Sequence, residues 1–118
     1  MDILIPEFKI ERRVRAMAHK ISEEHRASGD PLPPVMICVL NGGFMFFTDL
    51  VKDMGIDVSI DFIRAKSYEG KDNSGGVKFT KDLELHCKGR SVYIVDDIVD
   101  TGKTMFEILL KVNASDFV

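Results

Sequence analysis

The sequence predicts an α/β fold built on a parallel sheet, and two patterns carry that prediction. The first is a strand–helix–strand order, formed by the apolar run 35–40, a helical segment 44–54 and the alternating stretch 56–62. Such a unit joins parallel strands by a right-handed crossover. The second is another uninterrupted apolar run, 92–95, which leads through an acidic turn into a helical segment, 105–112. Runs without charge are typical of strands buried on both faces.

Three further segments complete the expected order of elements. Residues 10–26 carry apolar side chains at steps of four and three residues with charges between them, which predicts an amphipathic helix. From residue 64 to 76 the hydrophobic pattern disappears and glycines accumulate, so we expect a loop that is flexible over about residues 65–76. Residues 77–85 are expected to return as a strand or hairpin arm. A chain of 118 residues fits one domain.

Composition and charge argue against several classes of function. The net charge is -3 and there is no basic run, so the chain has no electrostatic footprint for nucleic acid or a membrane surface. We see neither a signal-peptide pattern nor an apolar run long enough to span a membrane. The two cysteines, Cys38 and Cys87, lack metal-ligand spacing. Reduced thiols in a cytoplasmic protein are the simplest interpretation.

The residues after the second apolar run combine carboxylates with a small-residue turn at the start of a helix. Asp96, Asp97 and Asp100 come first, and the stretch ends in Thr101-Gly102-Lys103-Thr104. Backbone N–H groups of such a turn point toward an anion, and the helix dipole and threonine hydroxyls add to the attraction. Carboxylates one loop width away can bind sugar hydroxyls or Mg²⁺, which prefers oxygen ligands. The stretch therefore predicts a binding site for a phosphorylated sugar.

Two other interpretations explain less of this stretch. Gly-Lys-Thr ends a nucleotide P-loop, but that motif needs a glycine five positions before Gly102, where this chain has Asp97. A carboxylate there would repel phosphates, which excludes the P-loop. An acidic turn that only caps the helix, with Asp100 or Thr101 as the N-cap, accounts for one or two residues. It does not account for three carboxylates beside a phosphate-type turn.

A second candidate site is Asn41-Gly42-Gly43, which follows the first apolar run and opens the next helical segment. Adjacent glycines let a backbone approach an anion closely, and a helix N-terminus favours negative charge. Ligands of open α/β sheets also bind beyond the carboxyl ends of the strands. Taken alone, the pair is as compatible with an ordinary connection between a strand and a helix.

Together these motifs resemble type I phosphoribosyltransferases, and among them the hypoxanthine-guanine enzymes. Residues 92–104 fill that family's pattern for binding phosphoribosyl pyrophosphate (PRPP): four hydrophobic residues, two acids, two hydrophobic residues, an acid and Thr-Gly-x-Thr. Residues 39–50 are similar to its pyrophosphate loop and following helix, although many members have a basic residue where this chain has Asn41. Residues 61–68 resemble the segment that leads into its flexible catalytic loop, with the pair Ser67-Tyr68.

The resemblance implies a Rossmann-like, parallel-sheet core and a purine salvage reaction. Ribose 5-phosphate would pass from PRPP to hypoxanthine or guanine with Mg²⁺, giving IMP or GMP and pyrophosphate. Asp96 and Asp97 would hold the ribose hydroxyls and Mg²⁺, directly or through water. Asp100 would exchange a proton with the purine, and Ser67 and Tyr68 would exclude water. The 5′-phosphate would bind Thr101, Gly102, Lys103 and Thr104, and the pyrophosphate Asn41, Gly42 and Gly43.

The resemblance also implies a cis peptide bond between Leu40 and Asn41 and assembly into a homo-oligomer, a dimer or a tetramer. It covers the chain from the first helix to about residue 110. Family members continue with another core strand and a C-terminal hood that reads the purine, so we expect a truncated core. The choice among hypoxanthine, guanine and xanthine stays open. Two other readings also stay open: a PRPP-binding regulatory protein, and a catalytically inert truncated fragment or isoform.

Overall fold

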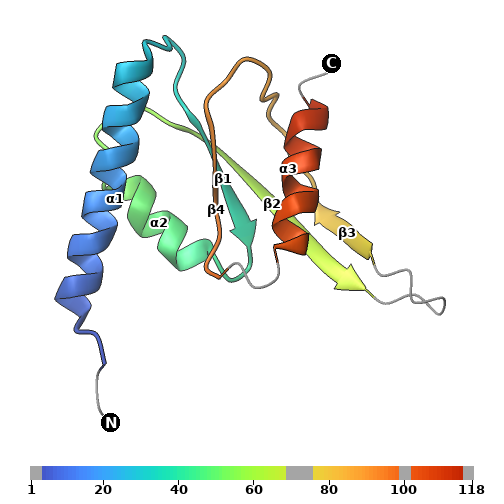
Figure 1. Cartoon of the computed structure of the whole chain (residues 1–118), viewed down its shortest axis with the longest axis horizontal. Helices are drawn as coiled ribbons and strands as arrows, with labels where there is room; N and C mark the ends of the chain where they lie inside the picture. The colour runs from blue at the N-terminus through green and yellow to red at the C-terminus, as the bar shows by residue number, and fades with distance from the viewer. Residues whose placement is uncertain (1–3, 69–75, 99–101, 116–118) are drawn as a thin grey trace.

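The computed structural model describes residues 4–68, 76–98 and 102–115 and shows one sheet with helices on both faces (Figure 1). The predicted α/β class is confirmed. The elements follow the order α1 (Glu7–Ser28), β1 (Val35–Leu40), α2 (Phe44–Lys52), β2 (Ser59–Tyr68), β3 (Gly76–Lys81), β4 (Val92–Val95) and α3 (Lys103–Ser115).

The sheet has the strand order β3-β2-β1-β4, and its three strand pairings set the geometry of the site. β1 runs parallel to both β2 and β4, with Cys38 opposite Phe62 on one side and Val95 on the other. β3 runs antiparallel to β2. The carboxyl ends of β1, β2 and β4 therefore point to one edge of the sheet, the edge at which ligands of open α/β sheets bind.

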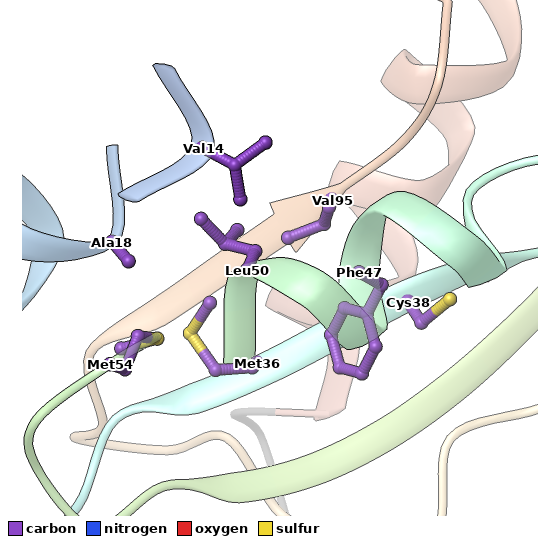
Figure 2. Close-up of a cluster of buried hydrophobic side chains, with 8 residues drawn as sticks. All are labelled: Val14, Ala18, Met36, Cys38, Phe47, Leu50, Met54 and Val95. Carbon is purple, nitrogen blue, oxygen red and sulfur yellow. The ribbon is translucent and has the colours of Figure 1, made fainter. Parts of the chain in front are cut away.

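β1 is buried on both faces because its alternate side chains belong to two cores. Met36 and Cys38 face α1 and α2, where the packed cluster also contains Val14, Ala18, Phe47, Leu50, Met54 and Val95 (Figure 2). Val35, Ile37 and Val39 face α3 and pack with Ile63, Cys87, Ile108 and Val112. Each fully buried aliphatic side chain contributes roughly 1.5–3 kcal/mol. These two cores hold the strand ends that carry the candidate site.

β4 differs from the prediction. Its apolar sequence predicts burial on both faces, but only Val95 is buried, and Val92, Tyr93 and Ile94 are half-buried. Among the described strands, β4 pairs with β1 alone, so its outer edge is open. A strand at the edge of a sheet lacks the neighbour that would cover the remaining surface.

β2 is longer and begins later than predicted. The alternating pattern predicts a strand over 56–62, whereas β2 spans Ser59–Tyr68 and forms a hairpin with β3. Residues 64–68 lack a continuous hydrophobic pattern, and the backbone ladder to β3 holds them in the strand. The predicted loop over about 65–76 is thus shorter at both ends. Its centre, residues 69–75, lies outside the described part of the chain.

α1 extends beyond both of its predicted ends. α1 spans Glu7–Ser28 against the predicted 10–26, and Gly29 ends it in a left-handed conformation with φ 74°. Ile10 was expected on the buried face of α1, but it is 51% exposed. His25 is buried, and its ring Nε2 lies 2.8 Å from the carbonyl oxygen of Leu32.

The remaining helix ends and the cysteines agree closely with expectation. α2 ends at Lys52, two residues before the predicted 54, and α3 extends the predicted 105–112 at both ends. Cys38 and Cys87 are buried free thiols. Among the helices in the described ranges, none has both the length and the apolar composition required to cross a membrane.

Candidate functional site

Three predicted site segments leave the sheet at the carboxyl ends of adjacent parallel strands. Asn41-Gly42-Gly43 follows β1, Asp96 and Asp97 follow β4, and Ser67 and Tyr68 are the last residues of β2. The turns after β1 and β4 lie together at the lower edge of the sheet in Figure 1. The parallel pairing of these strands is therefore what gathers segments that are far apart in the sequence.

The turn after β1 lies directly against the acidic loop after β4. A Cβ atom added at Gly42 would be 2.4 Å from Oδ2 of Asp97, a distance that side chains do not tolerate. A Cβ atom added at Gly43 would be 2.9 Å from the carbonyl oxygen of Val39 and 3.3 Å from that of Val95. Both glycines permit this close approach, so two motifs that the sequence presents separately form one site.

Backbone hydrogen bonds close the turn after β1. The peptide bond between Leu40 and Asn41 is cis, as the resemblance implied. The N–H of Gly43 donates to the carbonyl of Val39 at 3.2 Å, and the N–H of Phe44 donates to that of Asn41 at 3.2 Å. These two amides therefore form hydrogen bonds within the turn itself. Asn41 and Gly42 are exposed, so they are the part of the turn that an anion can reach.

The two carboxylates after β4 have different surroundings. Oδ1 of Asp96 accepts a hydrogen bond from the N–H of Asp97 at 2.8 Å, and Oδ1 of Asp97 accepts one from the N–H of Ile98 at 2.8 Å. Burial and the neighbouring Asp97 side chain raise the pKa of Asp96 above 3.8. The Ile98 amide lowers the pKa of Asp97 below 3.8. Asp97 is therefore the exposed carboxylate that stays ionised.

This pair fits an oxygen-ligated cation such as Mg²⁺. The described residues contain no group of three His, Cys, Asp or Glu side chains that could enclose a metal ion. Mg²⁺ does not need one, because it keeps several waters and binds proteins through one or two carboxylates together with phosphate oxygens of a substrate. Adjacent carboxylates of which one is exposed and ionised provide the protein's share of such a shell.

The predicted phosphate turn lies at the N-terminus of α3. Gly102 has φ 82°, a left-handed conformation that favours glycine, and its carbonyl accepts the N–H of Phe106 at 2.8 Å as the first helical bond. Lys103 and Thr104 form the first turn of the helix. Asp100 and Thr101, which were predicted to complete the site, lie outside the described residues.

Ser67 and Tyr68 are at the same edge of the sheet but further out. Arg64 is the β2 residue opposite Leu40, the last residue of β1. Ser67 and Tyr68 follow it by three and four positions, roughly 10–13 Å along a strand. They pair with Val77 and Gly76 in an arm that projects beyond the sheet (Figure 1). The backbone of this pair therefore lies three to four residues beyond the strand end that carries the predicted pyrophosphate turn.

Asp61 has a structural role that the sequence interpretation missed. It is 3% exposed, and its Oδ2 accepts hydrogen bonds from the N–H groups of Glu84 and Leu85 at 2.8 and 2.9 Å. These bonds tie the segment after β3 to β2, beneath the core that α3 covers. Residues 56–62 alternate between apolar and polar side chains, and Asp61 is one of the polar ones. Acids are common at such positions, so no sequence signal distinguished Asp61.

The chain was compared with known families and proteins. The phosphoribosyl transferase domain family matches residues 6–115. The hypoxanthine-guanine-xanthine phosphoribosyltransferase of Tritrichomonas foetus is 37% identical over 107 residues, which cover 91% of this chain and 56% of that protein. The hypoxanthine phosphoribosyltransferase of Escherichia coli is 34% identical over 109 residues, 92% of this chain and 60% of that protein. This chain thus spans well under two thirds of these curated relatives.

Solved structures show the same arrangement. A hypoxanthine-guanine phosphoribosyltransferase from Bacillus anthracis aligns with a TM-score of 0.82 at 32% identity. The alignment covers 98% of this chain and 63% of the Bacillus anthracis chain. A hypoxanthine phosphoribosyltransferase from Trypanosoma cruzi, in complex with the product IMP, aligns with a TM-score of 0.83 at 33% identity, covering 96% and 63%. Since the family match extends from just before α1 to the last residue of α3, this chain belongs to the phosphoribosyltransferase domain family.

Proposed function

We propose that this chain forms the PRPP-binding core of a cytoplasmic purine salvage phosphoribosyltransferase. The enzyme transfers ribose 5-phosphate from PRPP to hypoxanthine or guanine and releases pyrophosphate with IMP or GMP. The observation that carries the proposal is the contact between Gly42 and Asp97, because it joins the pyrophosphate turn to the sugar-phosphate loop. The names of the relatives support the substrate class, and they include xanthine as a further base.

The residues after β4 act on the sugar. The carboxylates of Asp96 and Asp97 hold the ribose hydroxyls and stabilise the positive charge that develops on the sugar carbon as pyrophosphate leaves. Bound Mg²⁺ supplies charge neutralisation on the pyrophosphate oxygens. Asp100 exchanges a proton with the purine ring, an effect typically worth about 10²–10⁴-fold. The 5′-phosphate binds Thr101, Gly102, Lys103 and Thr104 at the start of α3.

The other two segments hold and protect the reacting groups. The exposed Asn41 and Gly42, followed by Gly43, receive the pyrophosphate at the end of β1. Ser67 and Tyr68, on the arm formed by β2 and β3, cover the site during reaction and keep water from the activated sugar. Because that arm projects from the sheet, it closes by bending toward the strand ends. We further propose that the protein is a homo-oligomer.

Calorimetric titration of PRPP in the presence of Mg²⁺ tests the proposal. Gly102→Val places a branched side chain where the phosphate binds, so we expect PRPP affinity to fall about 10- to 100-fold, the loss of one or two charge-assisted hydrogen bonds. Gly89→Val is a matched control. Gly89 also has a positive φ, 70° against 82°, and at both positions an added Cβ would have no atom of a non-neighbouring described residue within 4 Å. Both variants thus carry the same backbone strain.

The comparison separates strain from binding. If Gly102→Val and Gly89→Val bind PRPP equally well, the turn at α3 does not hold the phosphate and the assignment is wrong. If only Gly102→Val loses affinity, the phosphate lies at the start of α3.

A further inference from the structure

The hairpin of β2 and β3 is irregular at the point where it leaves the sheet. Arg64 is the last residue of β2 that pairs with β1. The register of the hairpin shifts directly after it, because Arg64 lies opposite Lys81 whereas Ala65 lies opposite Phe79, which leaves Thr80 as an extra residue on β3. A β-bulge of this kind bends the strand and interrupts the backbone ladder. The bulge therefore lies at the base of the arm that projects beyond the sheet.

The arm beyond the bulge is weak on its own. Past Arg64, the described residues of β2 pair with β3 alone, and a hairpin of two strands is marginally stable in water. Lys66 lies directly opposite Lys78, and both side chains are exposed. Like charges that face each other across neighbouring strands destabilise the pairing. A modest contact at the base of the arm can therefore decide where the arm lies.

Lys111 of α3 makes contacts on both sides of the bulge. Its ammonium nitrogen lies 2.9 Å from Oδ2 of Asp82, the residue that follows β3 on the side of the sheet. The same nitrogen lies 5.3 Å from the centroid of the Phe79 ring, on the side of the arm, which is within the range of a cation–π interaction. Bending at Thr80 would move Phe79 relative to Asp82. Lys111 therefore resists bending at this point.

The helix that carries Lys111 is fixed to the sheet. Ile108 and Val112, the buried residues on either side of Lys111, pack with Ile37 and Ile63 in the core beneath α3. The other end of the same helix carries the predicted phosphate turn. Lys111 thus connects the arm to the element that begins at the proposed PRPP site.

We propose that the bulge at Thr80 is the hinge of the arm and that Lys111 is a positioning residue, which holds the arm in its projecting position. The inference rests on the proposed function, in which the arm bends toward the strand ends and covers the bound substrate. Such bending separates Lys111 from Phe79 or from Asp82. The contacts of Lys111 therefore oppose closure in the free protein, and substrate binding has to overcome them.

Amide hydrogen exchange of the protein without ligand tests the hinge. Lys111→Met keeps the apolar stem and removes the charge. Both partners of the ion pair are partly exposed, 38% and 54%, so we expect the arm amides to exchange about threefold to tenfold faster. The amides of β1 should not change. Lys111→Arg should restore the wild-type rates, because a guanidinium group can pair with a carboxylate and stack on a ring.

Lys88→Met is the matched control, since it removes the same charge from an exposed position outside α3, β2 and β3. It should leave exchange in the arm unchanged. Unchanged exchange in the arm of Lys111→Met would overturn the proposal. Equally faster exchange in the arm and in β1 would also overturn it, because Lys111 would then stabilise the whole fold and not the hinge.

Calorimetric titration of PRPP with Mg²⁺ on the same variants tests the positioning role. Because Lys111 opposes closure, Lys111→Met should bind PRPP about threefold to tenfold more tightly than the wild type. A residue that only stabilises the fold would not tighten binding. If Lys111→Met loosens the arm but binds PRPP with wild-type affinity, the positioning role is wrong. If the wild type does not bind PRPP, the proposed function fails, while hydrogen exchange still decides whether Lys111 holds the hinge.

Discussion

At the scale of single residues, the two glycines after β1 have different roles. A side chain at Gly42 would meet the carboxylate of Asp97, which can move, whereas one at Gly43 would meet the carbonyl oxygens of Val39 and Val95, which cannot. Gly42 therefore governs the position of a functional group. Gly43 governs the packing of the turn against the sheet.

This difference predicts two separable phenotypes. Gly42→Ala should keep its stability within about 0.5 kcal/mol and lose roughly tenfold in PRPP affinity, because it displaces Asp97. Gly43→Ala should lose about 1–3 kcal/mol of unfolding free energy through overpacking against backbone. Gly55→Ala is the control, since its nearest neighbour would be a flexible Arg26 nitrogen at 3.6 Å. Urea unfolding measures the stability of all three variants, and calorimetry measures their PRPP affinity. If Gly43→Ala is as stable as the wild type, the turn relaxes to admit the methyl group and this prediction is wrong.

The unequal carboxylates predict how PRPP binding depends on pH. Asp96 has a raised pKa and Asp97 a lowered one, so Asp96 takes up a proton first as the pH falls. Affinity for PRPP with Mg²⁺ should thus decrease as the pH falls through the raised pKa of Asp96. In Asp96→Asn that step should disappear, leaving only the fall at lower pH that belongs to Asp97. Because the titration of PRPP itself is common to both proteins, identical pH profiles would contradict the assignment.

At the scale of elements, the sequence pattern predicted a strand correctly where both faces of the strand are buried. The apolar run of β1 predicted its full length because both of its faces are covered by helices. The end of β2 was not predictable in this way, because residues 64–68 lack a continuous apolar pattern and pair with β3 through backbone hydrogen bonds. β4 was identified correctly, but its apolar sequence overstated its burial since one edge is open.

The candidate site was predictable to a similar degree. The motif after β4 and the glycine pair after β1 were identified from local sequence, because phosphate turns require particular residue types at fixed spacing. Their contact through Gly42 and Asp97 depends on the pairing of β1 with β4, which no local pattern specifies. The same holds for Asp61, whose partners Glu84 and Leu85 are more than twenty positions away in the sequence.

Asp61 anchors the connection that supports the arm formed by β2 and β3, and this predicts a clear loss of stability. Asp61→Ala leaves the amides of Glu84 and Leu85 without their acceptor, so we expect a cost of about 2–4 kcal/mol. Asp61→Asn keeps one acceptor oxygen and should cost less. Asp57→Ala, at an exposed position of the preceding turn, should change stability by under about 0.5 kcal/mol. If the Asp57→Ala and Asp61→Ala variants are equally stable in urea unfolding, Asp61 does not anchor this connection.

At the scale of the whole molecule, the apolar surface near α3 needs a cover. Ile98 is 75% exposed, Phe106 59%, and Leu109 and Leu110 are each 47% exposed. On α3 the buried Ile108 and Val112 form one apolar stripe, and the exposed Phe106, Leu109 and Leu110 form a second. A helix that is apolar on two sides is usually packed on both. Together with Ile98, which follows β4, this stripe leaves apolar surface exposed to solvent in the described part of the chain.

The last prediction concerns what the 118 residues can do without such a cover. The carboxylates and the two turns that we propose to bind anions belong to this chain, so PRPP with Mg²⁺ should bind measurably. Purine turnover should be close to background. The relatives that carry the reaction in their names are longer than this chain by more than a third of their own length, and we expect the purine contacts to come from that additional length. A base that is not held in line with the sugar carbon forfeits roughly 7–11 kcal/mol of positioning.

The measurement is nucleotide formation from PRPP with hypoxanthine and with guanine, alongside calorimetry on the same preparation. The Escherichia coli relative, assayed whole, is the positive control. Binding without turnover would show that PRPP recognition is complete in this chain while the purine pocket depends on residues outside it. Sustained turnover by the isolated chain would contradict this, and it would mean that α3 or the arm of β2 and β3 supplies the base contacts. Absence of both binding and turnover would refute the proposed core itself, since every group assigned to PRPP is encoded here.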